Sequence, residues 1–417
     1  MKPEMRSAGG VYVVDWKDEK VTIRVDRIVQ NHDYEVKGEV LVRTTAEAGP
    51  SHVHGPARFT LTSTPARKTL AKLLEERIDS VDWYAVIEQL CVAILEHYRQ
   101  GEPVVRLSEL PPPEHTPYRL APILFDGKPN LLYGFGGTLK STFANLCTLL
   151  IATGLTAHHL TPRQGNVLYL DYETDAQEHR QRLDMLAEGM GITCPPNIFY
   201  RYCTQPIAAD IADIQRIVTT EAITFLIVDS ALGACGASLN DDEAAGRTFL
   251  ALRSLRIGSL TLAHRRKNNP DGSGPLGSVY WTNSPRAVYE TRAAEQTDKA
   301  VQEVGLFPGK VNWGERVTPR GFAYHFNSHG IVVNDIGVSS VPDLEERLPL
   351  FERIASRIER DGPQAVGDLS EWLGQAGKAV SESSVRGTLN RYDKLFVHIK
   401  GGEHAGKWAK RALESSF

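Results

Sequence analysis

A glycine-rich segment between an apolar run and a helical run constrains this chain more than any other feature. Residues 133–142 read YGFGGTLKST, with the apolar run NLLYG leading into them and the helical run FANLCTLLIATG following. Glycines let backbone N–H groups curl around a phosphate, and the start of the next helix adds a positive dipole end. This order of strand, turn and helix predicts an α/β fold. The residues predicted to hold the phosphates of a nucleotide are Gly134, Gly136, Gly137, Thr138, Lys140, Ser141 and Thr142.

Two residues of this segment carry specific chemistry, and one departs from the usual pattern. Lys140 is expected to reach the β- and γ-phosphates, and the Ser141 hydroxyl is expected to ligate Mg²⁺. The standard string is G-x-x-x-x-G-K-[ST], and Leu139 stands where its last glycine belongs. Either the local backbone conformation is one that leucine tolerates, or nucleotide binding is weakened. A glycine-rich turn without a ligand is the competing interpretation.

Two later apolar runs end in acidic residues. NVLYLDYETD places Asp171 and Glu173 at the carboxyl end of a strand that we expect to neighbour the strand of the glycine-rich segment. A carboxylate there can orient and deprotonate the water that attacks the γ-phosphate, and Glu173 is the preferred candidate. The alternative is a helix N-cap cluster, for which Thr174 and Asp175 are suited. ITFLIVDS brings Asp229 to the end of another strand, where it is expected to hold Mg²⁺.

The segment after the next predicted strand is polar and basic. SLTLAH ends in His264, which can sense the γ-phosphate by hydrogen bonding or be an ordinary residue at a strand end. RRKNNPDGSGPLGS follows without hydrophobic periodicity, and its cations Arg265, Arg266 and Lys267 are predicted to track a DNA backbone. A solvated loop is the alternative. TNSPRAVYE then carries Arg286, which can act as a finger on a neighbouring subunit's γ-phosphate or be an exposed or ion-paired arginine.

Strand candidates alternate with helical runs from about Tyr118 to Asn334. The candidates are NLLYG, NVLYLDY, FLIVDS, SLTLAH and RAVYET, and their rhythm predicts an α/β core with a mostly parallel sheet. We therefore expect a core domain over residues 113–340, an N-terminal domain over 1–112 and a C-terminal domain over 341–417.

The first hundred residues predict a small α+β unit of unassigned role. VYVVDW, VTIRVDRIV and EVLVRTT alternate as strands do, and helical periodicity follows from Thr64 to about Arg99. The triple proline at 111–113 is expected to be a stiff linker. An apolar stripe in the second helical stretch is predicted to be core and consists of Trp83, Val86, Ile87, Leu90 and Ile94.

The segment from Val341 predicts three helices and a strand-turn-strand. LEERLPLFERIASRIER, QAVGDLSEWLG and SESSVRGTLNRYDKL are the helical stretches, and FVHIKGGEHAGKWAKRA supplies the ribbon. This order describes a winged helix-turn-helix, with docking of a protein as the alternative to DNA binding. The cations predicted to contact DNA are Arg386 and Arg391 on the third helix and Lys400 and Lys407 beside the wing.

Composition bounds the remaining possibilities. Hydrophobic residues make up 41% and charged residues 24% of the chain, which is the usage of a globular protein. Because the formal net charge is -4, any nucleic acid must be held by local basic surfaces. The five cysteines form no CxxC pair, and no apolar run is long enough to span a bilayer. We expect a cytoplasmic protein that does not contact a membrane.

The order of these motifs resembles the RecA/DnaB-like ATPases, and within them the RepA-type hexameric helicase family of plasmids and phages. The likeness runs through GFGGTLKST, VLYLDYE, FLIVDS, LAHRRK, GSVYWTNSPRAVYE and GKVNWGERVTPRGFAYHF. It implies a RecA-like core that binds ATP and Mg²⁺, with Glu173 as the catalytic base and with Asp229 and His264 at the metal and sensor positions. Arg286 matches the finger of that family loosely. The family also accommodates a bulky residue at the position of Leu139, which implies that this loop binds ATP.

Three functions remain open at this point. The first is a ring-forming ATP-driven motor, a homo-hexamer that moves on single-stranded DNA as a replicative helicase and can touch duplex DNA through its winged helix. The second is a DNA-bound ATPase switch, such as a helicase loader, a recombination mediator or a regulator, that does not unwind DNA. A DNA-binding protein without ATPase activity is supported by Leu139 alone.

Overall fold

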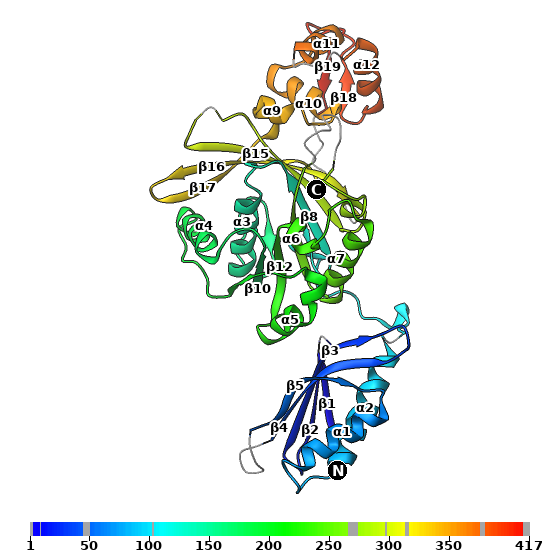
Figure 1. The fold of residues 1–417 in the computed structure, drawn as a ribbon. Coiled ribbons are helices and arrows are strands. Elements are labelled where there is room, and N and C mark those ends of the chain that lie inside the picture. Colours follow the sequence, from blue (N-terminus) through cyan, green and yellow to red (C-terminus); the bar gives the residue numbers. More distant parts are fainter. Residues whose placement is uncertain are drawn as a thin grey trace.

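The computed structural model describes residues 3–8, 10–44, 51–101, 104–265, 274–296, 298–312, 317–375 and 380–411. The chain runs from an N-terminal unit, through a central unit built on the largest sheet, to a small C-terminal unit (Figure 1). The buried apolar residues form separate clusters in these three units.

The N-terminal unit is an antiparallel sheet with two helices packed on it. Its strands are neighbours in sequence order and are β1 (Glu4–Ala8), β2 (Val11–Trp16), β3 (Val21–Gln30), β4 (Val36–Thr44) and β5 (His52–Thr60). Burial alternates along β2, because successive side chains of a strand point to opposite faces. Helices α1 (Thr64–Glu75) and α2 (Trp83–Gln100) cover the buried face. The predicted apolar stripe of α2 lies in this core, which confirms that prediction.

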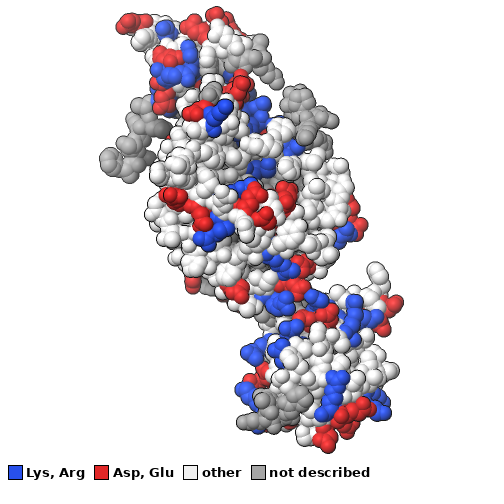
Figure 2. All heavy atoms as spheres, turned by 60° about the vertical axis from the view of Figure 1, so that its left-hand side comes forward, with Lys and Arg blue, Asp and Glu red and all other residues white. Residues whose placement is uncertain are grey.

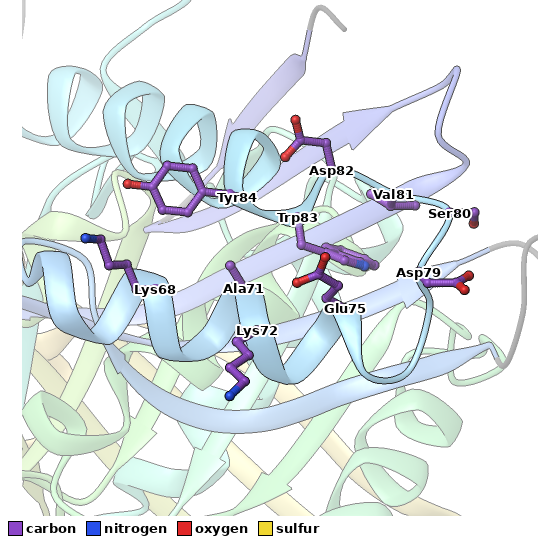
Figure 3. Close-up of a pocket in the computed structure, with 10 residues that line it drawn as sticks. All are labelled: Lys68, Ala71, Lys72, Glu75, Asp79, Ser80, Val81, Asp82, Trp83 and Tyr84. Atoms are coloured by element: carbon purple, nitrogen blue, oxygen red, sulfur yellow. The ribbon is translucent and has the colours of Figure 1, made fainter.

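An open hollow lies beside α1 and the start of α2 (Figure 3). Lys68 and Lys72 line it together with the acidic residues Glu75, Asp79 and Asp82. The hollow therefore carries charges of both signs, and its lining does not indicate one kind of ligand.

The central unit is built on a nine-stranded sheet with the order β11-β10-β12-β13-β8-β14-β15-β16-β17. Its parallel part consists of β11 (Ile198–Tyr202), β10 (Asn166–Asp171), β12 (Ile223–Asp229), β13 (Gly258–His264), β8 (Pro129–Gly134) and β14 (Ala287–Ala293). The antiparallel strands β15 (Val301–Val311), β16 (Arg320–Asn327) and β17 (Gly330–Ile336) extend the sheet beyond β14. The predicted α/β class with a mostly parallel sheet is confirmed.

Helices cover both faces of this sheet. One face packs against α3 (Lys140–Thr153) and α4 (Ala176–Gly189), and the other against α5 (Ile207–Thr220), α6 (Ala231–Cys235) and α7 (Asp242–Ser254). Strands covered on both sides are almost continuously apolar, which is why they stand out in the sequence. Shorter elements of this unit are β6 (Tyr118–Ala121), β7 (Leu124–Phe125), β9 (Thr161–Pro162) and α8 (Tyr280–Asn283).

The C-terminal unit consists of helices and a two-stranded antiparallel ribbon. Its elements are α9 (Pro342–Glu345), α10 (Leu350–Asp361), α11 (Val366–Gln375), α12 (Glu382–Arg391), β18 (Phe396–His398) and β19 (Trp408–Lys410). The single helix predicted over 344–360 is wrong, because the chain breaks between α9 and α10. Pro349 causes the break, since it has no N–H to donate and disfavours a helical conformation in the residue before it.

Among the described residues on the face shown in Figure 2, Lys and Arg are interspersed with Asp and Glu and form no continuous basic band. Any nucleic-acid contact on this face must therefore come from smaller groups of cations. None of the helices in the described ranges is both long and apolar enough to cross a bilayer.

Candidate nucleotide site

The glycine-rich segment connects β8 to α3 at the carboxyl edge of the sheet. β8 ends at Gly134, and α3 begins at Lys140. Gly134 is tightly surrounded, because a Cβ there would lie 2.4 Å from the Thr291 hydroxyl oxygen and 2.6 Å from that of Thr138. The glycines at 136–137 face open space, with no atom within 4 Å of an added Cβ. The loop is thus held at its start by β14 and is open where a phosphate would approach.

Leu139 adopts the left-handed conformation, with φ 54° and ψ 30°. This conformation costs a residue that has a Cβ about 1–2 kcal/mol, whereas glycine adopts it freely. The Leu139 side chain is partly buried and packs against the core beneath α3, which offsets part of that cost. The loop therefore makes a turn that suits the standard glycine, at some cost in stability.

Asp229 ends β12 and accepts hydrogen bonds from two hydroxyl groups. The Ser141 hydroxyl donates to Asp229 Oδ2 at 2.7 Å, and the Tyr169 hydroxyl donates to the same oxygen at 2.9 Å. Burial raises the pKa of Asp229, while these two hydrogen bonds act to lower it. A hydroxyl and a carboxylate side by side are the hard oxygen ligands that Mg²⁺ prefers, so Ser141 and Asp229 fit the predicted metal.

Lys140 lies folded over the loop that precedes it. Its Nζ donates to the carbonyl oxygens of Gly134 and Phe135, at 3.2 and 2.8 Å. Burial lowers the pKa of Lys140, although the charges of Asp229 and Glu173 act in the opposite direction. The ammonium group can exchange these carbonyl contacts for a phosphate while it stays beside the loop.

Glu173 lies on the turn that follows β10. Buried Asp171 shapes this turn, because its carboxylate accepts hydrogen bonds from the backbone N–H groups of Glu173 and Thr174, at 3.0 and 3.2 Å. Glu173 Oε1 accepts a hydrogen bond from the Ser230 hydroxyl and lies 3.9 Å from His264 Nε2. Asp171 therefore holds the turn, whereas the Glu173 side chain, 44% exposed, is open to the cavity.

The N-cap of the helix after Glu173 is Asp175 and not Glu173. Asp175 caps α4, since its side chain accepts hydrogen bonds from the N–H groups of Gln177 and Glu178, at 2.8 and 3.0 Å.

The strand order corrects one prediction. The strand that precedes Glu173, β10, does not neighbour the strand of the loop, β8, because β12 and β13 lie between them. Glu173 still reaches the cavity, because the carboxyl ends of parallel strands share one edge of the sheet.

These side chains meet in a cavity of about 260 Å³. Arg182 also lines it, and the sequence analysis missed this residue. Its signal is its place about two turns into the helix that follows Glu173, since side chains of a helix point toward its N-terminal end, which here is the end beside the cavity. The predicted residues that line the cavity are Gly136, Gly137, Lys140, Ser141, Thr142, Glu173, Asp229 and His264.

The structure does not place any of the three cations predicted to contact DNA at 265–267 on the protein surface. Arg266 and Lys267 lie outside the described residues. The Arg265 side chain is 6% exposed, its Nη1 lies 3.0 Å from Glu290 Oε1, and its guanidinium stands over the Phe135 ring. An arginine buried in an ion pair meets DNA only if it leaves that pair, so the structure does not support the predicted role of Arg265.

Arg286 lies at the amino end of β14, away from the cavity of its own chain. Ala287 pairs with Asn130 near the start of β8, whereas Thr291 pairs with Gly134, where the loop begins. The separation along the strand is roughly 16 Å at about 3.3 Å per residue. Arg286 can therefore act on a nucleotide only if another copy of the chain presents it.

The four predicted cations of the C-terminal unit differ in exposure. Arg386 and Arg391 are exposed on α12, Lys400 is exposed after β18, and Lys407 is partly buried before β19. Lys410, in the same ribbon, forms an ion pair with Glu359 at 2.7 Å. The exposed cations of α12 have no such pair among the described side chains, so their charge is available to a partner.

The sheet, the loop and the convergent oxygen ligands have the arrangement of a P-loop nucleotide site, and one comparison with known proteins agrees. Residues 100–270 match the family described as the AAA domain. No curated protein matches the sequence. A solved structure of a KaiC-like protein from the hyperthermophilic archaeon Pyrococcus horikoshii OT3 is similar at 16% identity and a TM-score of 0.36, over 51% of this chain and 91% of that one.

Replacing Asp229 with Asn is expected to raise the free energy of unfolding of the nucleotide-free protein at neutral pH. Burial raises the folded-state pKa of this carboxyl, so its ionisation costs more in the folded protein than in the unfolded chain. The contribution of Asp229 to stability is complete below the unfolded-state pKa and is lost as the pH rises through the folded-state pKa. The advantage of Asp229→Asn should therefore grow across that interval and then stay constant.

Urea unfolding over a pH series measures this difference. Asp33→Asn, in an exposed turn of the N-terminal unit, is the control and should follow the parent protein at each pH. An Asp229→Asn advantage that does not change with pH would contradict burial of the charged carboxylate as its cause.

Proposed function

We propose that this protein is a ring-forming, ATP-driven DNA motor: a homo-hexamer of RecA-like cores that moves on single-stranded DNA as a replicative helicase of phage or mobile-element type. Three features support the proposal. Each chain has a nucleotide cavity, each chain places an arginine where only another chain can use it, and the C-terminal unit exposes cations that have no acidic partner among the described side chains. The order of sequence motifs, which resembles the RepA-type family, supports the RecA-like assignment of the core.

Each group in the cavity has a distinct role in this proposal. Lys140 binds the β- and γ-phosphates, and Ser141 and Asp229 hold Mg²⁺. The metal, when bound, neutralises charge on the phosphate oxygens. Glu173 takes the proton of the attacking water, since its carboxylate is open to the cavity and Asp171 holds the turn on which it lies. His264, beside that carboxylate, hydrogen-bonds the γ-phosphate.

The single observation that carries the DNA part of the proposal is the set of uncompensated cations on α12. Arg386 and Arg391 are exposed on this helix, and Lys400 is exposed at the turn of the ribbon that follows. In a winged helix-turn-helix, the helix at this place lies in a groove of DNA and the ribbon flanks the backbone. The C-terminal unit has the elements of such a module in the same order, so these cations are placed to meet phosphates.

Strand separation on a forked DNA duplex tests the proposal. We expect unwinding that requires ATP hydrolysis, together with closed rings in electron micrographs of particles formed with ATP and single-stranded DNA. ATP hydrolysis that responds to DNA without strand separation would favour the alternative, a DNA-bound ATPase switch such as a helicase loader or a recombination mediator. If neither ATP hydrolysis nor ring assembly changes when DNA is added, both the DNA motor and the DNA-bound switch are contradicted.

A double variant, Arg386→Ala with Arg391→Ala, tests the contact itself. The slope of log affinity against log salt should fall by roughly one unit for each phosphate contact that is lost. Lys410→Ala, whose charge is already paired with Glu359, is the matched control and should leave the slope near that of the parent. An unchanged slope in the double variant would favour protein docking, rather than DNA binding, as the role of the C-terminal unit.

A further inference from the structure

Lys310 of β15 reaches across to the turn that leads into Arg286. Its Nζ donates to the carbonyl oxygens of Thr282, Asn283 and Pro285, at 3.2, 2.6 and 3.1 Å. Carbonyl groups at the end of a helix lack donors within the helix, and a lysine side chain can supply them. One ammonium group thus ties together the end of α8 and the residues before Arg286.

The same turn is held from two other elements. Arg253 of α7 donates to the Ser284 carbonyl oxygen at 2.8 Å. The backbone N–H of Arg286 donates to the Pro129 carbonyl oxygen of β8 at 2.7 Å, and the Arg286 carbonyl oxygen accepts from the Asn312 N–H at 3.2 Å. Arg286 therefore leaves a turn that is fixed by α7, β8 and β15 together, which limits the directions its side chain can take.

The arrangement brings three cations together. Burial lowers the pKa of Lys310, and the charges of Arg286 and Arg253 lower it further. Cations gathered in this way repel one another in the isolated chain, and a bound anion relieves the repulsion.

We propose that Lys310 is a positioning residue for the second half of the ATP site. It holds the 282–285 turn so that the Arg286 guanidinium projects toward the phosphates of ATP bound to another copy of the chain. The inference rests on the proposed function, because Arg286 acts only if copies share their sites. Lys310 itself acts through hydrogen bonds to the backbone and does not touch the phosphate.

The test compares ATP hydrolysis by full-length Lys310→Met, Lys310→Gln and Arg286→Ala proteins. Methionine keeps the length of the side chain but cannot donate to the carbonyls, whereas glutamine can donate without a charge. We expect Lys310→Met to lower kcat by about 10²-fold, because a misplaced catalytic group loses that much, while KM stays within about twofold. Lys310→Gln should have a kcat close to that of the parent, because its amide can still donate to the carbonyl oxygens. Lys72→Met, on the exposed side of α1, is the control for removing a surface lysine and should match the parent.

Mixing separates a positioning role from damage to the fold. Lys310→Met protein mixed with Lys140→Ala protein should recover activity, since an intact loop from one then meets an intact turn from the other. Parent-like kcat in Lys310→Met, with Arg286→Ala inactive, would overturn this inference and leave the proposed function standing. Full activity of Arg286→Ala would exclude Arg286 as the finger and would overturn this inference, whereas the proposed function is tested separately by strand separation on forked DNA. Lys310→Gln as inactive as Lys310→Met, or no recovery on mixing, would also overturn the positioning role.

Discussion

Exchanging Glu173 for Gln is expected to lower kcat for ATP hydrolysis by about 10²–10⁴-fold while ATP binding is retained. The carboxylate can take a proton from the attacking water, whereas the amide of glutamine cannot. The exchange should leave the local structure intact. The amide oxygen can still accept the Ser230 hydroxyl, and Asp171 holds the backbone of the turn without help from the Glu173 side chain. Nucleotide titration and single-turnover hydrolysis measure the two effects separately.

Two further variants are compared with Glu173→Gln, one that should lose nucleotide binding and one that should behave as the parent. Lys140→Ala should lose both binding and turnover, because the phosphates lose their main cationic partner. Glu188→Gln, an exposed position near the end of α4, removes a carboxylate outside the cavity and should behave as the parent does. Turnover of Glu173→Gln at the parent rate would remove Glu173 from the role of base.

The parts of the fold that the sequence predicts are those that local chemistry determines. β8, β10, β12, β13 and β14 are covered on both faces, so each appears in the sequence as a short, mainly apolar run. The strand β11 escaped notice because it lies at the edge of the sheet, where its residues are half exposed and mixed in character. The predicted helix over 344–360 overlooked Pro349, whose effect is also local and could have been read from the sequence.

The parts that the sequence could not give depend on contacts between distant segments. Nothing local shows that β12 and β13 stand between the strands of Glu173 and the glycine-rich loop. Arg265 resembles its basic neighbours in sequence, and only the position of Glu290 on β14 shows that its charge is buried in an ion pair. Lys310 likewise gains its place from the pairing of β15 with β14, which brings it over a turn far away in sequence. A motif predicts which residues carry chemistry, whereas the sheet decides which of them can meet.

Replacing Arg286 with Ala is expected to lower kcat by about 10³–10⁵-fold, the range of an arginine finger, while ATP binding and ring assembly persist. A finger stabilises charge in the transition state rather than in the ground state, so the loss should appear in kcat and not in the affinity for ATP. The position of Arg286 leaves no role in its own cavity, because a strand's length separates it from the loop at Gly134. Arg247→Ala, an exposed arginine of α7 paired with Glu243, is the matched control and should hydrolyse ATP at the parent rate.

Mixing Arg286→Ala with Lys140→Ala protein is the sharper measurement, because it depends on which chain supplies each half of the site. Each variant alone has one defective half at every interface and should be nearly inactive. In mixed rings, some interfaces join an intact loop from an Arg286→Ala chain to an intact arginine from a Lys140→Ala chain. If sites are shared, ATPase activity should rise on mixing to a fraction of the parent value, with the largest recovery near equal amounts. Activity that stays at the sum of the two variants would place both halves in one chain, and full activity of Arg286→Ala alone would exclude this residue as the finger.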